Sequence, residues 1–127
     1  MVSRLLCVAV IGSVVLASMA GVATGHVARW DSEIKITGYV DNTSFLGKVR
    51  SERKACKRKR EVSVWKRNPG AMDAPVGTAR TNRRGIWAVS APGAEAGVYY
   101  AHVKKRVRKR AGHEHVCKGD RSPSFKL

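Results

Sequence analysis

Short runs of alternating apolar and polar residues, separated by turn-forming residues, constrain the fold of this chain more than any other feature. Alternation of this kind places every second side chain on the same face of a β-strand. From Ser32 onward, apolar residues nowhere recur at helical spacing over three turns. The sequence therefore predicts an all-β domain.

Seven strands are predicted, and Gly, Pro, Asn or Asp residues bound most of them. Their expected ranges are 34–37, 45–50, 62–65, 76–81, 85–89, 98–103 and 122–127. The fourth and fifth strands flank Asn82-Arg83-Arg84, so we expect them to form a hairpin whose turn ends at Gly85. Seven short antiparallel strands at this spacing predict an immunoglobulin-like β-sandwich of two packed sheets.

The inward positions of these strands define an expected core. It consists of Ile34, Ile36, Phe45, Val49, Val62, Val64, Val76, Trp87, Val89, Tyr99, Ala101, Val103 and Phe125. Burying each large apolar side chain contributes about 1.5 to 3 kcal/mol before conformational entropy is subtracted. A core of this size is small, so a covalent cross-link would supply a sizeable part of the net stability.

Residues 1–25 have the pattern of a secretory signal peptide. Arg4 precedes a short apolar run, which is followed by small residues. Cleavage is expected after Ala20 or after Gly25, and residues 26–127 would then form one exported domain, secreted or on the cell surface. The alternative is that the segment is retained as an N-terminal anchor.

Two of the three cysteines, Cys56 and Cys117, lie in the predicted domain. In a small exported domain such a pair is most simply a disulfide, because the compartment is oxidising and the core is limited. The loop-entropy model gives about 4 kcal/mol of stabilisation for a loop of this length. The alternative is two free thiols.

Several short motifs together resemble a known module. They are Gly47-Lys48-Val49-Arg50-Ser51, Arg60-Glu61-Val62-Ser63-Val64-Trp65, Val76-Gly77-Thr78, Thr81-Asn82-Arg83-Arg84-Gly85-Ile86-Trp87 and Gly97-Val98-Tyr99-Tyr100-Ala101. With them, the predicted domain resembles transthyretin-like modules, which occur in carboxypeptidase regulatory domains and in the B-type repeats of surface adhesins. The form with two cysteines and a basic surface resembles small exported proteins of actinobacteria. The resemblance implies a β-sandwich with a non-catalytic accessory or surface role.

Positive charge dominates the composition, with 25 Lys and Arg against 9 Asp and Glu and a net charge of +16 at pH 7. Two clusters hold much of it, one around Cys56 and one shortly before Cys117. Their members are Arg53, Lys54, Lys57, Arg58, Lys59 and Arg60, and then Lys104, Lys105, Arg106, Arg108, Lys109 and Arg110. A disulfide would gather these twelve residues at one end of the domain. We call them the basic pole.

The basic pole predicts attraction to anions. Candidate ligands are teichoic acid, phospholipid head groups, acidic polysaccharide and, without sequence specificity, nucleic acid. The alternative is that the clusters form solvated loops and a charged strand edge that prevents edge-to-edge pairing.

The histidines suggest a copper or zinc site. His113 and His115 are separated by Glu114 in a segment expected to be a polar loop, and His26 would become the N-terminal residue after cleavage at Gly25. Its amine and imidazole could then chelate copper. Spacing places no third ligand, so no metal or other cofactor is expected.

The sequence predicts no enzyme, because it contains no nucleophile elbow, no informative carboxylate pair and no phosphate-binding loop. The expected function is an exported binding or structural module that contacts anionic cell-envelope polymers or a membrane surface through the basic pole. The alternatives are a structural module for a protein partner and a secreted copper- or zinc-binding protein.

Overall fold

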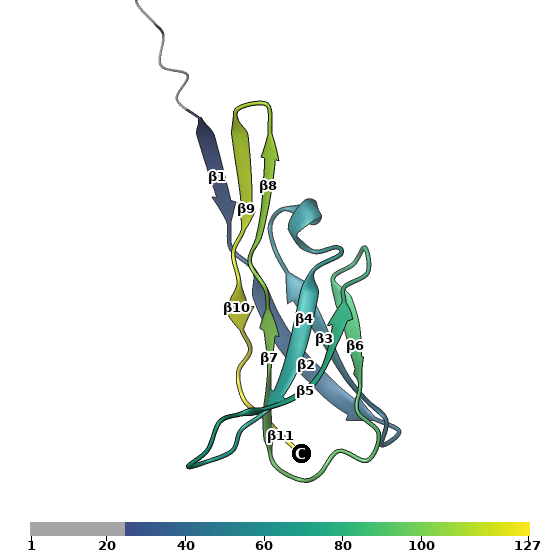
Figure 1. Cartoon of the computed structure of the whole chain (residues 1–127). Helices are drawn as coiled ribbons and strands as arrows, with labels where there is room; N and C mark the ends of the chain where they lie inside the picture. The colour runs from purple at the N-terminus through teal and green to yellow at the C-terminus, as the bar shows by residue number, and fades with distance from the viewer. Residues whose placement is uncertain (1–24) are drawn as a thin grey trace, which may run out of the picture.

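The computed structural model describes residues 25–127, so the predicted signal peptide lies almost entirely outside the described residues. This part of the chain is all-β, with eleven strands in three sheets and one short 3-10 turn, η1 (Lys54–Cys56) (Figure 1). The prediction of an all-β domain is confirmed, whereas the prediction of seven strands in two sheets is wrong. No helix in residues 25–127 is long and apolar enough to cross a membrane.

Two of the sheets pack face to face around the core. One has the order β2-β3-β6 and the other the order β10-β7-β4-β5, with β11 also paired to β7. Their strands are β2 (Glu33–Val40), β3 (Ser44–Arg50), β6 (Ile86–Ser90), β4 (Glu61–Lys66), β5 (Ala74–Arg80), β7 (Val98–Val103), β10 (Asp120–Arg121) and β11 (Phe125–Lys126). The single last strand predicted over 122–127 is therefore replaced by two shorter ones.

Alternation explains why the two sheets meet as they do. Ten of the thirteen predicted core residues are buried, while Ile36, Val76 and Phe125 are partly buried and pack against that cluster. Trp87 lies opposite Gly47 on the neighbouring strand, where a Cβ atom would stand 2.0 Å from the indole. The glycine therefore gives the largest core side chain its space.

The segment between β5 and β6 has the predicted turn but not the predicted pairing. Gly85 has a φ of +80°, in the left-handed region, and its amide donates to the carbonyl of Asn82. The strands on either side do not pair, because β5 pairs with β4 and β6 with β3. The predicted hairpin is wrong, since this turn carries the chain from one sheet to the other.

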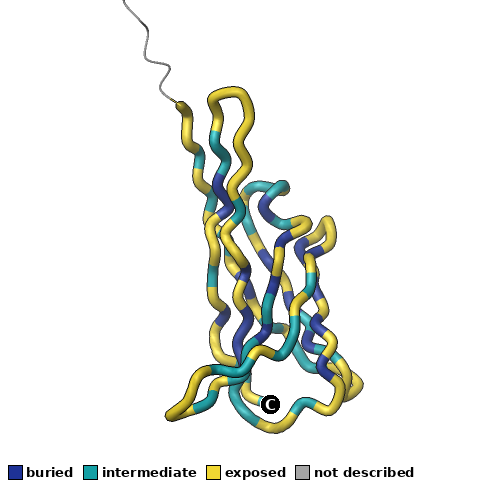
Figure 2. Tube along the Cα trace, in the orientation of Figure 1, coloured by how far each residue is buried: buried dark blue, intermediate teal, exposed yellow. Residues whose placement is uncertain are grey.

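The third sheet, which we call the hairpin sheet, consists of β1 (His26–Trp30), β9 (His113–Cys117) and β8 (Arg106–Arg110) in that order. β8 and β9 form an antiparallel hairpin that extends beyond the two packed sheets, and its outer end is largely exposed (Figures 1 and 2). β1 pairs with β9 in parallel. The prediction that His113 and His115 lie in a loop is therefore wrong, since both belong to β9.

Candidate anion-binding site at the basic pole

A disulfide joins Cys56 in η1 to Cys117 at the end of β9, with 5.4 Å between the two Cα atoms. The predicted pairing is confirmed. It ties the loop between β3 and β4 to the hairpin sheet. Disulfides of this kind form in oxidising compartments.

The guanidinium of Arg106 holds the two basic clusters together. It donates from Nη1 to the carbonyl oxygens of Arg58 at 3.0 Å and Lys59 at 3.3 Å, and from Nη2 to the carbonyl oxygen of Ala55. These acceptors belong to the loop that contains Cys56. The two clusters are therefore in direct contact, as the disulfide predicted.

Arg60 differs from the other members of the basic pole because it is completely buried. Its Nη1 donates to Ser32 Oγ at 2.8 Å and to the carbonyl of Cys56 at 2.7 Å, and its Nη2 donates to the carbonyls of Lys104 at 2.9 Å and Lys118 at 3.0 Å. The prediction that Arg60 binds an external anion is therefore corrected. Its guanidinium connects four segments of the chain.

No carboxylate accompanies this buried charge, because the four acceptors are a hydroxyl and three carbonyl oxygens. Burial first, and then the neighbouring charge of Arg106, lower the pKa of Arg60 to about 10. Arg60 is still a cation at neutral pH. It adds a fixed positive charge beneath the surface of the basic pole.

The loop and the hairpin sheet enclose a cleft of about 230 Å³ between them. The cleft is lined by Arg53, Ala55, Arg58, Arg106, Arg108, Arg110, His115 and Cys117. We call it the arginine cleft. Three of its arginines, Arg106, Arg108 and Arg110, alternate along β8, so the period of the strand directs them to the same face.

The arginine cleft contains unpaired positive charge. Its lining includes no Asp or Glu, and within residues 25–127 none of its five arginines forms an ion pair. Burial, followed by the charges of Arg108 and Arg58, lowers the pKa of Arg106. The cleft therefore offers guanidinium groups whose charge the described residues leave uncompensated.

Two aromatic groups fix one wall of the cleft. The guanidinium carbon of Arg53 lies 4.1 Å from the ring centroid of Trp30, which in turn lies 5.4 Å from the ring centroid of His115. Cation–π contact of this kind restrains an arginine that would otherwise sample many rotamers. Sequence reasoning did not place Trp30 in this site, because β1, which contains it, was not predicted.

Four lysines of the basic pole line other surfaces. Lys59, Lys104 and Lys105 line a second groove of about 240 Å³, which shares Arg106 with the arginine cleft and includes an acidic residue, Glu61. Lys57 lines a larger groove of mixed charge. The predicted pole thus divides into an arginine cleft without acidic residues and lysine-bearing surfaces with them.

The metal candidates come together only in part. The ring centroids of His26 and His113 lie 6.2 Å apart on neighbouring strands. His115, on the same face of β9, has its pKa lowered by burial first and then by Arg53 and the other cations nearby. Across the described residues, no group of three His, Cys, Asp or Glu side chains is placed to hold a metal ion.

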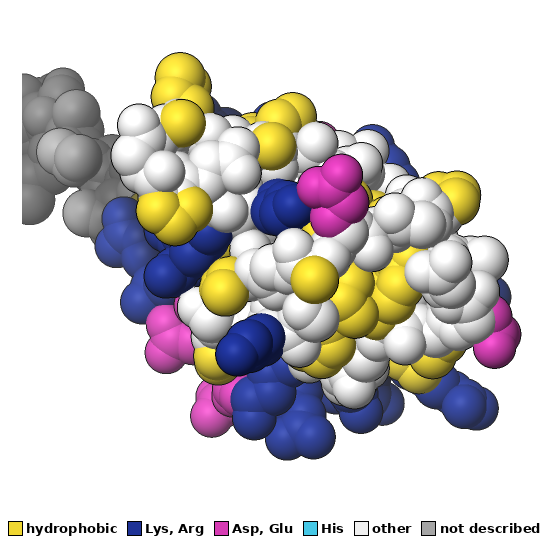
Figure 3. Space-filling model, turned by 90° about the horizontal axis from the view of Figure 1, so that it is seen from below, with side chains coloured by type: hydrophobic (Ala, Val, Ile, Leu, Met, Phe, Trp, Pro, Cys, Tyr) yellow, Lys and Arg dark blue, Asp and Glu magenta, His cyan; other side chains and the backbone are white. Residues whose placement is uncertain are grey.

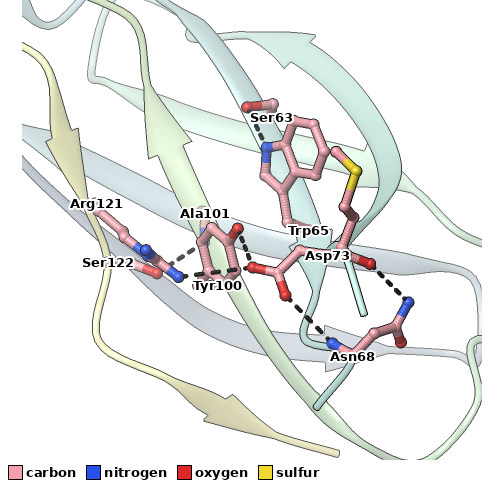
Figure 4. A network of polar contacts seen from close by, with 9 residues as sticks. Ser63, Trp65, Asn68, Asp73, Tyr100, Ala101, Arg121 and Ser122 are labelled. Carbon is pink, nitrogen blue, oxygen red and sulfur yellow. Dashed lines mark hydrogen bonds and ion pairs between the residues drawn. The ribbon is translucent and has the colours of Figure 1, made fainter. Parts of the chain in front are cut away.

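Charge is paired on the face of the sheet that contains β4, β7 and β10. Tyr100 donates from its hydroxyl to Asp73 Oδ2 at 2.7 Å, and Arg121 lies 3.9 Å from the same oxygen (Figure 4). The hydrogen bond from Tyr100 and that from the amide of Asn68 lower the pKa of Asp73. This network compensates its own charge, which the arginine cleft does not.

No protein-family model matches the chain, and no curated protein matches it.

Proposed function

We propose that this protein is an exported, non-enzymatic module that binds anionic polymers of the cell envelope through its basic pole. The observation that supports the proposal most directly is the arginine cleft, where five arginines converge without a carboxylate. A site of this composition attracts and orients anions, because guanidinium groups donate charge-assisted hydrogen bonds to oxyanions.

The high net charge of +16 supports the same conclusion at longer range. Such a field accelerates encounters with a polyanion and makes its binding depend steeply on salt, since each neutralised charge releases counterions. Export is part of the proposal and rests on the sequence pattern of residues 1–25 together with the disulfide. We also propose that the domain is a transthyretin-like module, which agrees with a binding role.

The test is co-sedimentation of the oxidised protein with isolated cell walls, and separately with neutral and anionic liposomes, across roughly 50 to 500 mM salt. The proposal expects retention on the walls at low salt that falls steeply as salt rises. Liposomes indicate whether a membrane surface suffices. Absence of retention on every anionic material, or retention that salt leaves unchanged, would contradict the electrostatic account.

A pair of charge-matched variants separates the basic pole from net charge alone. Arg108→Gln/Arg110→Gln removes two cations from the arginine cleft, and Arg67→Gln/Lys126→Gln removes two exposed cations outside it. We expect the first variant to lose most of its retention and the second to keep it. Equal weakening in both would show that the protein binds by its overall charge, with no role for the pole.

A further inference from the structure

We propose that the arginine cleft is a subsite for a single phosphate group, and that it distinguishes phosphate-containing polymers from those whose charge comes from carboxylates. This inference rests on the proposed function and makes it more specific. It follows from the chemistry, the rigidity, the size and the charge of the cleft.

Every Lys or Arg residue that lines the cleft is an arginine. The alternation of β8 directs Arg106, Arg108 and Arg110 into it, whereas Lys105 and Lys109 line other surfaces. A guanidinium presents a planar fork of donors that matches two oxygens of a phosphate, while an ammonium acts as a point charge. The separation of these arginines from Lys105 and Lys109 along this segment therefore favours an oxyanion that several forks can share.

The cationic groups of the cleft are held in place before any ligand arrives. Arg106 donates its Nη hydrogens to carbonyl groups of the facing loop, so it supplies a fixed charge and leaves the free donors to the other arginines. Arg53 lies against Trp30. The disulfide fixes the loop to the hairpin sheet at Cys117, which itself lines the cleft. Preorganisation of this kind reduces the entropy lost on binding, which favours a defined subsite over a mobile cationic surface.

The volume of the cleft suits one small anion. A water molecule takes about 30 Å³ in the liquid, so a cleft of about 230 Å³ holds a phosphate group with a few waters. The ligand should therefore enter by one phosphate, with the rest of the polymer outside.

The charge around the cleft also favours a compact oxyanion. Arg60 is buried nearby without a carboxylate, and Arg106 lies close enough to contribute to the lowered pKa of its guanidinium. An anion among the cleft arginines would offset the mutual repulsion of these cations. The groove of mixed charge around Lys57 has Asp31, Glu33 and Glu52 in its lining and lacks this property.

The experiment compares two polyanions of matched length and charge, polyphosphate and polyglutamate, by titration calorimetry at one ionic strength. The variant Arg108→Lys/Arg110→Lys keeps the charge of the cleft and removes two forks. We expect its affinity for polyphosphate to fall about tenfold, and its affinity for polyglutamate to stay within about twofold of wild type. The control Lys105→Gln/Lys109→Gln removes two charges from the same segment outside the cleft and should lower both affinities by similar, smaller factors.

The outcomes separate the subsite from the proposed function. If wild type and the lysine variant bind both polymers alike, the phosphate subsite is overturned while polyanion binding stands. If wild type binds neither polymer, both proposals fail. Melting temperature and thiol titration establish that each variant is folded and oxidised, so loss of affinity in a folded variant reports on the cleft.

Competition with small phosphates identifies the source of the group. Displacement of polyphosphate by inorganic phosphate or by dimethyl phosphate, but not by acetate at equal ionic strength, supports the subsite. Preference for dimethyl phosphate indicates a phosphodiester, as in a polymer backbone or a lipid head group, and preference for inorganic phosphate indicates a terminal or free phosphate. Equal displacement of polyphosphate by acetate would overturn the phosphate subsite.

Discussion

Different interactions stabilise the two ends of the molecule. At the basic pole, a disulfide and two arginines that donate to carbonyl groups join the loop between β3 and β4 to the hairpin sheet and to the segment after β7. At the opposite end, hydrophobic side chains gather in the middle of the surface and most Lys and Arg lie around them (Figure 3). One end leaves cations unpaired, and the other presents apolar side chains at its surface. The basic pole can therefore accept an anion without rearranging.

Packing between aromatic rings stabilises the end of the molecule opposite the basic pole. The ring of Phe45 lies 4.7 Å from those of Tyr39 and Tyr99, measured between centroids, and 6.1 Å from Phe125. The hydroxyl of Tyr39 donates to the carbonyl of Ala91 at 2.6 Å. These contacts stabilise through burial and hydrogen bonding, so changes there should alter stability and leave anion binding intact.

Removal of the disulfide should have the largest effect and should act at the pole in two ways. For Cys56→Ser/Cys117→Ser we expect a loss of about 4 kcal/mol in the free energy of unfolding, because a closed loop of 61 residues is released in the unfolded chain. Chemical denaturation measures this. Phosphate binding should weaken as well, since the loop that carries Arg53 and Arg58 is no longer tied to β9.

A reducing agent provides the control for this prediction. It should destabilise the wild type by a similar amount and leave the double variant unchanged. If the wild type were equally stable with and without reductant, the disulfide would not stabilise the basic pole. The two ends would then not differ in covalent stabilisation.

Arg60→Met should have the second largest effect. The substitution leaves four acceptor groups without the guanidinium that bridges them, and an unsatisfied buried polar group costs about 1 to 3 kcal/mol. Removing a buried charge offsets part of that cost. We expect a net loss of about 3 kcal/mol by denaturation. An equally stable Arg60→Met would show that burial of the guanidinium costs as much as its hydrogen bonds contribute.

Phe45→Leu should have a smaller effect, confined to the opposite end. The substitution keeps an apolar side chain but loses ring contacts with Tyr39 and Tyr99, which should cost about 1.5 kcal/mol. Affinity for polyphosphate should not change when measured well below the melting temperature. If affinity fell with stability, the two ends would be coupled, and the pole would not be an independent unit.

The sequence was more informative about the packed sheets than about the pole. Alternation identified Phe45, Val49 and the other core residues because each strand of a two-sheet core has one apolar face. Turn residues located the turn before Gly85 but not the partner of β5, since local turn chemistry does not determine which strands pair. Cysteine count and the predicted export were enough to predict the disulfide.

The pole was harder to predict because its strands lack an apolar face. β8 consists of Arg106-Val107-Arg108-Lys109-Arg110 and becomes a strand by pairing with β9, which no local pattern reveals. Burial of Arg60 had no signal either, because an arginine in a basic run is expected in solvent. The recurrence of arginine at every second position of β8 was the one available clue to a cleft, once that segment is taken as a strand.

The smallest predicted effect is a pH dependence from His115, which lines the arginine cleft. Burial and the positive charges of Arg53, His113, Arg110 and His26 lower its pKa below 6.5. Without a ligand, the unfolded chain therefore takes up this proton more readily, and stability falls as pH drops below 6.5. A phosphate in the cleft reverses the local field and favours the imidazolium.

Binding should consequently be accompanied by proton uptake, and the affinity for dimethyl phosphate should rise about fivefold between about pH 8 and pH 5.5. This ligand does not titrate in that range, so the change reports on the protein. His115→Gln keeps His26 and His113 and should remove most of the rise. If the variant retained the full pH dependence, His115 would not face the bound anion, and the wall of the cleft near Trp30 would not take part in binding.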